Sequence, residues 1–349
     1  MSSSSASILP TPDFSWDPAV RPPVAGLRPY REQTYRLEPE IVGSKFVVHN
    51  YGHGGAGITL SWGCAQEVIK ILRTRGLAAD DSIAVLGAGV MGLTAALLLL
   101  ALNLKLTIYA KEFPPHTTSN VAGGQWAPSM VNHRDPVQFT RILRGAHQEH
   151  KSRGAAYGVS PRENYTLVHA SNFESCPPDV IPRPDAFAHL PFAHLTSPGF
   201  GYATLLVEPP IFLAKMQADL HAANVTLVPY ELTTLGQISN LSETIVVNCT
   251  GLGSKAICND RLMHSVKGQL VLLPPQPNLQ YLFAGHHGYV FPRQDCVVVG
   301  GSEEMDIADP IPNMQICKAI LANMKGIFTG GPTMAMQEEM APSWAMRSK

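Results

Sequence analysis

A strand, a glycine-rich turn and a helix follow one another at residues 82–102, and this combination restricts the fold more than any other segment. The apolar run Ser82–Leu86 predicts a buried strand, which leads into Gly87-Ala88-Gly89-Val90-Met91-Gly92 and the helical stretch 93–102. A G-x-G-x-x-G turn between a strand and a helix is typical of the opening of a Rossmann unit, where phosphates lie at the N-terminus of the helix. Such a unit normally begins a nucleotide-binding chain, but here residues 1–81 precede it.

A second glycine-rich loop lies upstream, at residues 49–59, where the chain reads HNYGHGGAGIT before a helical stretch at 60–73. Its glycines let backbone N–H groups approach a planar ring, and the helix that follows adds the positive end of its dipole. A tight turn without a ligand is the alternative, but so many glycines carry a conformational-entropy cost that a bare turn seldom needs. The loop therefore predicts a second wall of the same binding site.

Other short blocks flank these two loops. GLRPYR stands at 26–31 and RLE at 36–38, and downstream come TTSNVAGGQW at 117–126, VVNCTG at 246–251, VKGQ at 266–269, YVFPR at 289–293 and VVGG at 298–301. With the two loops, these blocks resemble the D-amino-acid oxidase family over roughly residues 20–305. In that family the R-P-x-R and HNYGHGG blocks come last, near the C-terminus. The resemblance therefore implies the same fold in circularly permuted order.

The resemblance implies an α/β fold in which a Rossmann-like FAD-binding domain is interleaved with an α+β substrate-binding domain that contains a mixed sheet. Hydrophobic patterns predict further strands at 104–109, 225–228 and 244–249 and a helix at 206–222. We expect a discontinuous FAD-binding domain at 40–130 and 225–262, and a substrate-binding domain at 17–39, 131–224 and 263–328. Residues 1–16 and 329–349 are expected to be tails.

FAD, bound without a covalent link, is the cofactor that the resemblance implies. Gly87 permits the tight turn, Gly89 lets the backbone approach the pyrophosphate, and Gly92 lets the helix pack on the strand. Glu112 is the candidate for the ribose, although the family has an acid–arginine pair where Lys111 and Glu112 stand; an exposed Glu112 without a ligand is the alternative. The residues expected to line FAD are Gly54, Gly55, Ala56, Gly57, Ile58, Thr59, Gly87, Gly89, Val90, Met91, Gly92, Lys111, Glu112, Thr117, Thr118, Ala122, Gly123, Gly124, Gln125, Trp126, Thr250 and Gly251.

Arg28 is the strongest candidate for substrate binding, because it matches the arginine of the family's G-x-R-P block. A guanidinium fixes a carboxylate by two parallel hydrogen bonds and so holds the Cα of an amino acid in place for hydride transfer. Tyr289 matches a tyrosine whose hydroxyl also reaches the carboxylate, with a core tyrosine as the alternative, and Gly55 is expected to face the substrate. His286 and His287 stand near a position where the family has a second tyrosine; they either adjoin the substrate or lie in a solvated loop.

These residues predict an FAD-dependent oxidase that removes a hydride from the Cα of an amino acid, with a D-amino acid as the expected substrate. The products would be an imino acid, then a 2-oxo acid and ammonia, with O2 reduced to H2O2. No catalytic acid or base is assigned, because an amine bound in its neutral form needs none. The alternatives are an FAD-dependent oxidoreductase of another amine or secondary amine, and a flavin-binding protein without turnover.

Composition limits the expected partners to an amino acid or amine and O2, with the oligomeric state left open. The net charge of −1 gives no basic field for nucleic acid, and the apolar run 83–110 contains spaced glycines that predict strand, turn, helix and strand rather than a membrane span. The six cysteines form no C-x-x-C pair and the thirteen histidines show no ligand spacing, so we expect no metal. Cytoplasm is the expected location; the peroxisome is the alternative by family habit only, because the sequence lacks the S-K-L end of a peroxisomal protein.

The absence of a covalent flavin link is testable on the purified holoprotein. Acid precipitation should release the yellow chromophore into the supernatant, because packing and hydrogen bonds alone hold it and both are lost when the chain unfolds. Absorbance of supernatant and pellet measures the release, and a covalently flavinylated protein treated in the same way is the control. Colour that stays in the pellet would contradict the prediction.

Overall fold

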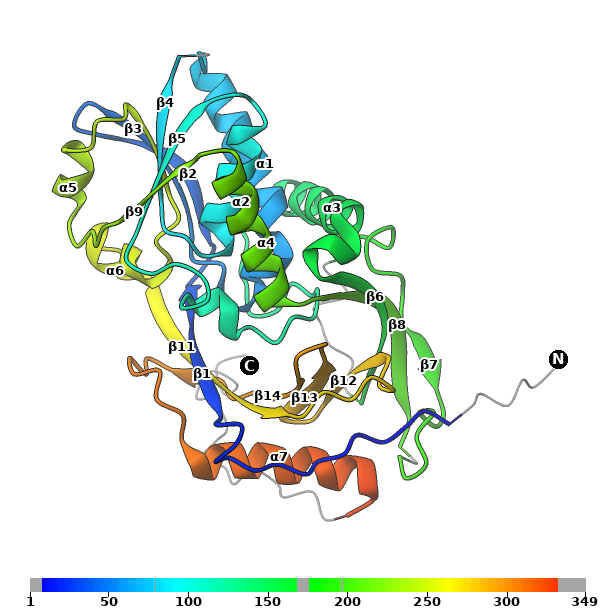
Figure 1. Cartoon of the computed structure of the whole chain (residues 1–349). Coiled ribbons are helices and arrows are strands. Elements are labelled where there is room, and N and C mark those ends of the chain that lie inside the picture. Colours follow the sequence, from blue (N-terminus) through cyan, green and yellow to red (C-terminus); the bar gives the residue numbers. More distant parts are fainter. Residues whose placement is uncertain (1–7, 79, 168–175, 196, 332–349) are drawn as a thin grey trace.

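The computed structural model describes residues 8–78, 80–167, 176–195 and 197–331. Within these residues the chain forms two sheets and the helices that flank them (Figure 1). One sheet contains β2 Arg36–Val42, β3 Lys45–Tyr51, β4 Ser82–Leu86, β5 Lys105–Ala110, β9 Thr226–Pro229 and β10 Ile245–Asn248. The other contains β1 Val24–Arg31, β6 Val159–Thr166, β7 Asp185–Phe187, β8 Gly199–Val207, β11 Met263–Leu273, β12 Tyr281–Gly285, β13 Gly288–Pro292, β14 Val297–Gly300 and β15 Glu304–Met305. The helices are α1 Gly57–Arg75, α2 Val90–Leu100, α3 Pro136–Arg153, α4 Pro209–Ala222, α5 Leu235–Ser239, α6 Ser254–Ile257 and α7 Met314–Thr329.

The six-stranded sheet has the order β2-β3-β10-β4-β5-β9, and its strands are parallel except β2, which runs antiparallel to β3. Parallel strands covered on both faces read as apolar runs, and β4 and β10 consist almost entirely of buried residues. Helices α1 and α2 pack together, and α4 contacts α2 (Figure 1). The predicted strand Ser82–Leu86 is confirmed, and those at 104–109, 225–228 and 244–249 differ from β5, β9 and β10 by one residue at each end.

Residues 24–51 join the two sheets. β1 pairs antiparallel with β11 along its whole length, from Val24 opposite Leu270 to Arg31 opposite Met263. β3 runs parallel to β10 in the other sheet. The segment upstream of the Rossmann turn is therefore no separate domain, because it supplies strands to both sheets.

The nine-stranded sheet has the order β1-β11-β14-β13-β12-β6-β8-β7, with β15 beside β11. Successive residues of a strand point to opposite faces, so the register decides which side chains share a face. Tyr289 is opposite Gly300, which is itself opposite Leu270. Leu270 is opposite Val24, four residues before Arg28 in β1. Arg28 and Tyr289 therefore share one face of the sheet, and the apolar cluster that includes α7 covers the other (Figure 1).

Residues 8–16, which the sequence assigns to a tail, pack along α7 (Figure 1). Phe14 is buried, and the centroid of its ring lies 5.8 Å from that of Phe328. The Tyr281 hydroxyl donates to the carbonyl oxygen of Pro10 at 2.6 Å. The expectation of a tail is wrong for this segment, because its apolar side chains complete the core below the sheet. Residues 1–7 and 332–349 lie outside the described part of the chain.

Helix α4 begins later than expected, at Pro209 rather than residue 206, because β8 continues to Val207. Helix α3 begins where the Asp135 carboxylate accepts the N–H groups of Val137 and Gln138, with Pro136 at the first helical position. The sequence assigns α3 and α4 to the substrate-binding domain, but α3 contacts α1 and α4 contacts α2. The division into two domains stays a prediction.

Candidate active site

Three loops of the expected cofactor site leave the same edge of the six-stranded sheet. β10 lies between β3 and β4, and Asn248 at its end is opposite both His49 and Leu86. Because the carboxyl ends of parallel strands meet at one edge, the loops that follow these three residues lie together. The Asn248 amide nitrogen is also 3.1 Å from Nδ1 of His49. The fold thus brings residues 52–59, 87–92 and 250–251 to one place.

The turn after β4 is shaped by contacts that only glycine allows. Gly87 has φ +97°, and a Cβ there would lie 2.5 Å from the carbonyl oxygen of Cys249. A Cβ at Gly92 would lie 1.9 Å from the carbonyl oxygen of Gly87, so α2 packs directly on the turn. Gly89 precedes α2 without a side-chain cap, and the Val90 N–H donates to the Ser119 hydroxyl at 3.1 Å. The turn, including Met91, offers bare backbone at the positive end of a helix. Such an arrangement fits a pyrophosphate.

The GHGG loop is packed against residues 129–130. A Cβ at Gly54 would lie 2.0 Å from the carbonyl oxygen of Met130, and one at Gly55 would lie 3.0 Å from that of Ser129. His53 is buried, and burial lowers its pKa to about 3. The imidazole is therefore neutral, so any positive potential at this loop comes from backbone N–H groups rather than from His53.

Thr59 ties α1 to the block at 117–126. Its hydroxyl donates to the carbonyl oxygen of Ala127 at 2.8 Å and accepts the N–H of the same residue at 3.1 Å. Contact of this buried side chain with flavin stays a prediction. Ala56, Gly57 and Ile58 lie at the start of α1, where no side chain caps the helix. Uncapped N–H groups at a helix N-terminus suit a negatively charged ring edge.

The block at 117–126 reaches the sheet face that carries Tyr289. A Cβ at Gly123 would lie 3.2 Å from the Tyr289 hydroxyl. The Gln125 amide donates to the Tyr202 hydroxyl at 2.9 Å, and the indole N–H of the fully buried Trp126 lies 3.3 Å from a ring nitrogen of a histidine in α3. The side chains of Gln125 and Trp126 thus have protein partners. The backbone of Trp126 is paired as well, because its N–H donates to the carbonyl oxygen of Leu205 at 2.8 Å and its carbonyl oxygen accepts from the Thr204 hydroxyl at 2.7 Å. The contacts of both residues with FAD stay predictions.

The remaining predicted cofactor residues differ in exposure. The hydroxyls of Thr117 and Thr250 each donate to a neighbouring asparagine, at 2.7 and 2.8 Å. Lys111 is exposed and pairs with Glu231 at 2.7 Å, and Glu112 beside it is exposed as well. This exposure favours the alternative of a solvated Glu112, and its contact with a ribose stays a prediction. The last four residues of the predicted set contact other parts of the protein or begin a turn. Thr118 begins a 3-10 turn, and the carbonyl oxygen of Ala122 accepts a hydrogen bond from Arg293. The carbonyl oxygen of Gly124 accepts one from the N–H of Val207, and Gly251 lies beside Pro29.

Arg28 lies across a glycine of the neighbouring strand. A Cβ at Gly268 would lie 2.3 Å from Nη2 and 2.5 Å from Cζ of the guanidinium. Nη1 donates to the carbonyl oxygen of Ser302 at 3.0 Å. The Ser302 hydroxyl in turn donates to Glu304 at 2.6 Å and accepts the N–H of Gln269 at 3.1 Å. The guanidinium is therefore held in one place, and its remaining N–H donors suffice for a carboxylate.

Tyr289 lies over two glycines in the same way. A Cβ at Gly300 would lie 2.6 Å from its hydroxyl and one at Gly301 would lie 3.0 Å from it, while its ring stacks on Phe291 with centroids 4.2 Å apart. Burial raises the pKa of Tyr289, and the charge and hydrogen bonding of Arg28 act in the opposite direction. The structure thus brings Arg28 and Tyr289 together, as the sequence predicts; their binding of a carboxylate stays a prediction.

His286 and His287 form the two-residue turn between β12 and β13, and both side chains are exposed. His287 has φ +55°, as the tight turn requires. A Cβ at the preceding Gly285 would face Met324 and Ile327 of α7, on the side of the sheet opposite Tyr289. Gly285 therefore does not face Tyr289, and the exposure of the two histidines favours the alternative of a solvated turn.

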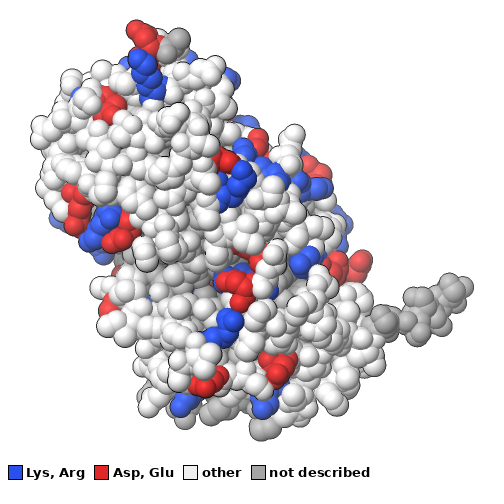
Figure 2. All heavy atoms as spheres, in the orientation of Figure 1, with Lys and Arg blue, Asp and Glu red and all other residues white. Residues whose placement is uncertain are grey.

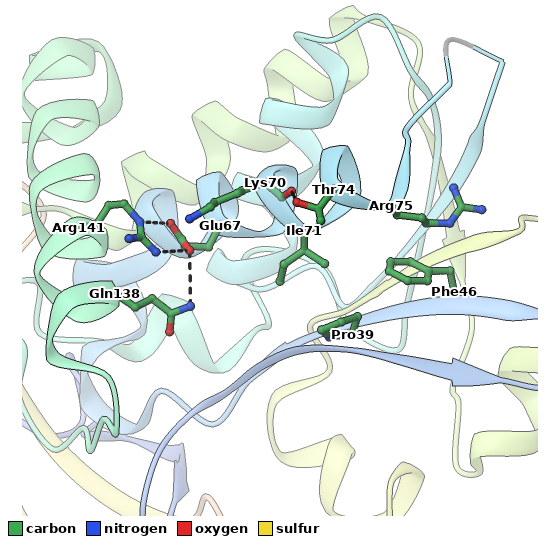
Figure 3. A pocket seen from close by; sticks show the side chains of 9 residues that line it. All are labelled: Pro39, Phe46, Glu67, Lys70, Ile71, Thr74, Arg75, Gln138 and Arg141. Atoms are coloured by element: carbon green, nitrogen blue, oxygen red, sulfur yellow. Dashed lines mark hydrogen bonds and ion pairs between the residues drawn. The ribbon is translucent and has the colours of Figure 1, made fainter.

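A hollow of about 480 Å³ lies elsewhere, between α1, α3 and the strands β2 and β3 of the six-stranded sheet (Figure 3). Glu67 lies at one end of the lining, where Arg141 pairs with it, with Nε 2.6 Å and Nη2 2.8 Å from the carboxylate. At the other end, the Arg75 guanidinium lies 5.2 Å from the centre of the Phe46 ring. None of the predicted site residues lines this hollow.

Charged side chains of both signs are interspersed over the face shown in Figure 2. In the part of the chain that the structure describes, no helix is long and apolar enough to cross a membrane. The described residues also contain no group of three His, Cys, Asp or Glu side chains that could hold a metal ion.

Comparison with known proteins adds an independent observation. A model of the family described as FAD dependent oxidoreductase matches residues 82–348. The chain is 26% identical to a D-amino-acid oxidase from Streptomyces coelicolor, covering 69% of this chain and 76% of that protein. It is 27% identical to a D-aspartate oxidase from Homo sapiens, covering 69% and 74%. Among solved structures, an L-amino acid deaminase from Proteus vulgaris matches with a TM-score of 0.54 at 13% identity, covering 72% of this chain and 75% of that one.

Gly268→Ala tests the position of Arg28. The new methyl group would occupy the space of the guanidinium, which can swing away because it is the end of a flexible side chain, so the protein should still fold and bind FAD. We expect benzoate, a small carboxylate, to bind at least about tenfold more weakly, because its charge-assisted pair with Arg28 is lost. Titration followed by flavin absorbance measures this. The matched control is Gly236→Ala in α5, where the nearest atom to a Cβ is 4.0 Å away; equal affinities in all three proteins would contradict the assignment.

Proposed function

This chain belongs to the FAD dependent oxidoreductase family, and we propose that within it the protein is an amino-acid oxidase that acts on D-amino acids. It would convert the amino acid into an imino acid, which water hydrolyses to a 2-oxo acid and ammonia, while O2 is reduced to H2O2. The observation that carries the proposal is the juxtaposition of Arg28 and Tyr289 next to Gly123, in the block expected to border the flavin. The names of the curated relatives, which are D-amino-acid and D-aspartate oxidases, support it.

FAD, when bound, supplies the hydride acceptor. The backbone of the 87–92 turn would hold its phosphates, and the start of α1 with residues 123–126 would border its ring. Arg28 would bind the substrate carboxylate by parallel hydrogen bonds, and the Tyr289 hydroxyl would donate to the same group. Because burial raises the pKa of Tyr289, this hydroxyl stays protonated at neutral pH. Both side chains orient the substrate and neither needs to exchange a proton.

The choice of the D enantiomer depends on which face of the Cα turns toward the flavin once the carboxylate is on Arg28. We propose it because relatives from three organisms carry the names of D-amino-acid or D-aspartate oxidases. The L-amino acid deaminase from Proteus vulgaris supports the fold alone.

We also infer that the chain order is a circular permutation of the family's order. The family match begins at Ser82, the first residue of β4, although residues 24–51 complete both sheets. α1 ends at Arg75, so a short link joins it to β4. The segment at 8–16 lies beside α7, so the two ends of the described chain are neighbours (Figure 1). Neighbouring ends are what a permutation requires.

Rejoining the chain in the other order tests this inference. A gene that begins at Ser82, continues to residue 331, passes through a flexible Gly/Ser linker to residue 8 and ends at Gly76 should give a yellow protein with wild-type FAD content. The physical reason is that all strand pairs are kept and only one exposed link is cut. FAD content and far-ultraviolet circular dichroism measure the outcome. A colourless, unfolded product would contradict the permutation.

The proposed reaction is tested with paired D- and L-amino acids and a peroxide assay on the purified holoprotein. We expect peroxide with D-amino acids, and a loss of activity of at least about a hundredfold in Arg28→Ala with FAD still bound, because the carboxylate loses its bidentate partner. Arg144→Ala is the control, since this exposed arginine of α3 pairs only with Asp179 among the described residues, and Asp179 is exposed as well. Peroxide from L-amino acids alone would overturn the stereochemistry, and near-normal turnover of Arg28→Ala would overturn the site.

A further inference from the structure

β6 presents polar side chains to the sheet face that carries Tyr289. Thr166 of β6 is opposite Ala284 of β12, and Ala284 is opposite Tyr289 of β13, so these three residues share a face. Asn164 is two residues before Thr166 and therefore points to the same face. Tyr165, between them, points to the opposite face, where its ring packs against Phe192.

Asn164 is completely buried, and neither its amide oxygen nor its amide nitrogen has a hydrogen-bond partner among the described residues. On the same face of β6, the Ser160 hydroxyl and Nε of Arg162 are also buried without a partner. Buried polar atoms in folded proteins nearly always have a partner, because an unpaired one loses its hydration without compensation. A ligand that enters from this face would supply the missing bonds of Asn164.

The position of Asn164 suits the far end of a substrate side chain. β6 is two strands from β13, and Asn164 is offset by two residues along the strands from the position level with Tyr289, which gives roughly 12 Å between the two backbone positions. A glutamine whose carboxylate is bound at Arg28 and Tyr289 would bridge such a distance, with a hydrogen bond of about 3 Å at each end. Tyr202, which is opposite Asn164, receives a hydrogen bond from Gln125. The block expected to border the flavin therefore reaches this part of the face.

We propose that Asn164 determines substrate specificity by hydrogen-bonding a carboxamide at the end of the amino-acid side chain, a role that rests on the proposed function. An asparagine offers one acceptor and one donor group side by side, and a carboxamide can form a hydrogen bond with each of them. A carboxylate would leave the Asn164 oxygen unpaired, and a methyl group would leave both atoms unpaired.

The charges near Asn164 agree with a neutral side chain. Arg162, two residues away, is the cation on this face of β6, and burial lowers its pKa while the Glu208 carboxylate acts in the opposite direction. The Glu208 carboxylate therefore offsets part of this charge within the protein. A substrate carboxylate would bring a second negative charge toward Glu208.

Binding of analogues that lack the amine, and so are not oxidised, tests the proposal directly. Glutaramate carries the carboxylate and the carboxamide, hexanoate replaces the carboxamide by an apolar end, and glutarate replaces it by a carboxylate. Calorimetry on the wild-type holoenzyme should show glutaramate bound at least about tenfold more tightly than either, because a site built for hydrogen bonds rejects analogues that lack them. Asn164→Leu, of similar volume, should remove the preference over hexanoate, and Ser160→Ala should keep it.

Turnover provides the second measurement. The ratio of kcat/KM for D-glutamine over D-methionine should fall by at least about tenfold in Asn164→Leu. If Asn164→Leu does not bind FAD, Asn164→Ala takes its place and should lose the preference, because it offers neither the donor nor the acceptor. Equal binding of glutaramate and hexanoate by the wild type, tighter binding of glutarate, or a preference unchanged in the variants would overturn the proposal. An Asn164-dependent preference without turnover of any amino acid would instead overturn the proposed oxidase function and leave the binding role standing.

Discussion

The placement of β10 between β3 and β4 is the constraint on which the cofactor side of this molecule depends. Each of the three parallel strands ends in a loop of the expected FAD site, and Asn248 is in register with both His49 and Leu86. A shift of this register would separate the GHGG loop from the phosphate turn. Because these strands come from distant parts of the chain, the site exists only when β3, β10 and β4 have paired.

On the substrate side, glycines in the neighbouring strands set the geometry of the candidate site. Arg28 lies across Gly268, and Tyr289 lies across Gly300 and Gly301, where any Cβ would collide with them. A strand normally sends side chains straight out from its face, but a glycine in the neighbouring strand lets a long polar side chain lie flat against the sheet. The floor of the candidate site is therefore backbone, and the functional ends of Arg28 and Tyr289 meet above it.

The sequence predicts the cofactor side better than the substrate side, for a physical reason. Glycine spacing and apolar runs are local signals, so the strand–turn–helix at 82–102 and the loop at 49–59 can be placed without knowing their partners. Helix α7 carries a local signal too, since Cys317, Ile320 and Met324 recur at helical spacing after the Asn313 cap. Asn164 has no such local signal. Its burial and its lack of hydrogen-bond partners depend on strands β8 and β12, which pair with β6 and come later in the chain.

The pairing of β1 with β11 also governs when the molecule can be completed. Val24 pairs with Leu270, so at a synthesis rate of about 5–20 residues per second its partner leaves the ribosome on the order of ten seconds or more later. In that interval Val47 and Val48 of β3, fully buried in the finished sheet, have no strand β10 beside them. Long-range pairing of this kind slows folding and exposes apolar strands to aggregation. β1 and β3 are thus synthesised well before β11 and β10, the strands that cover them, and their apolar residues stay exposed for that time.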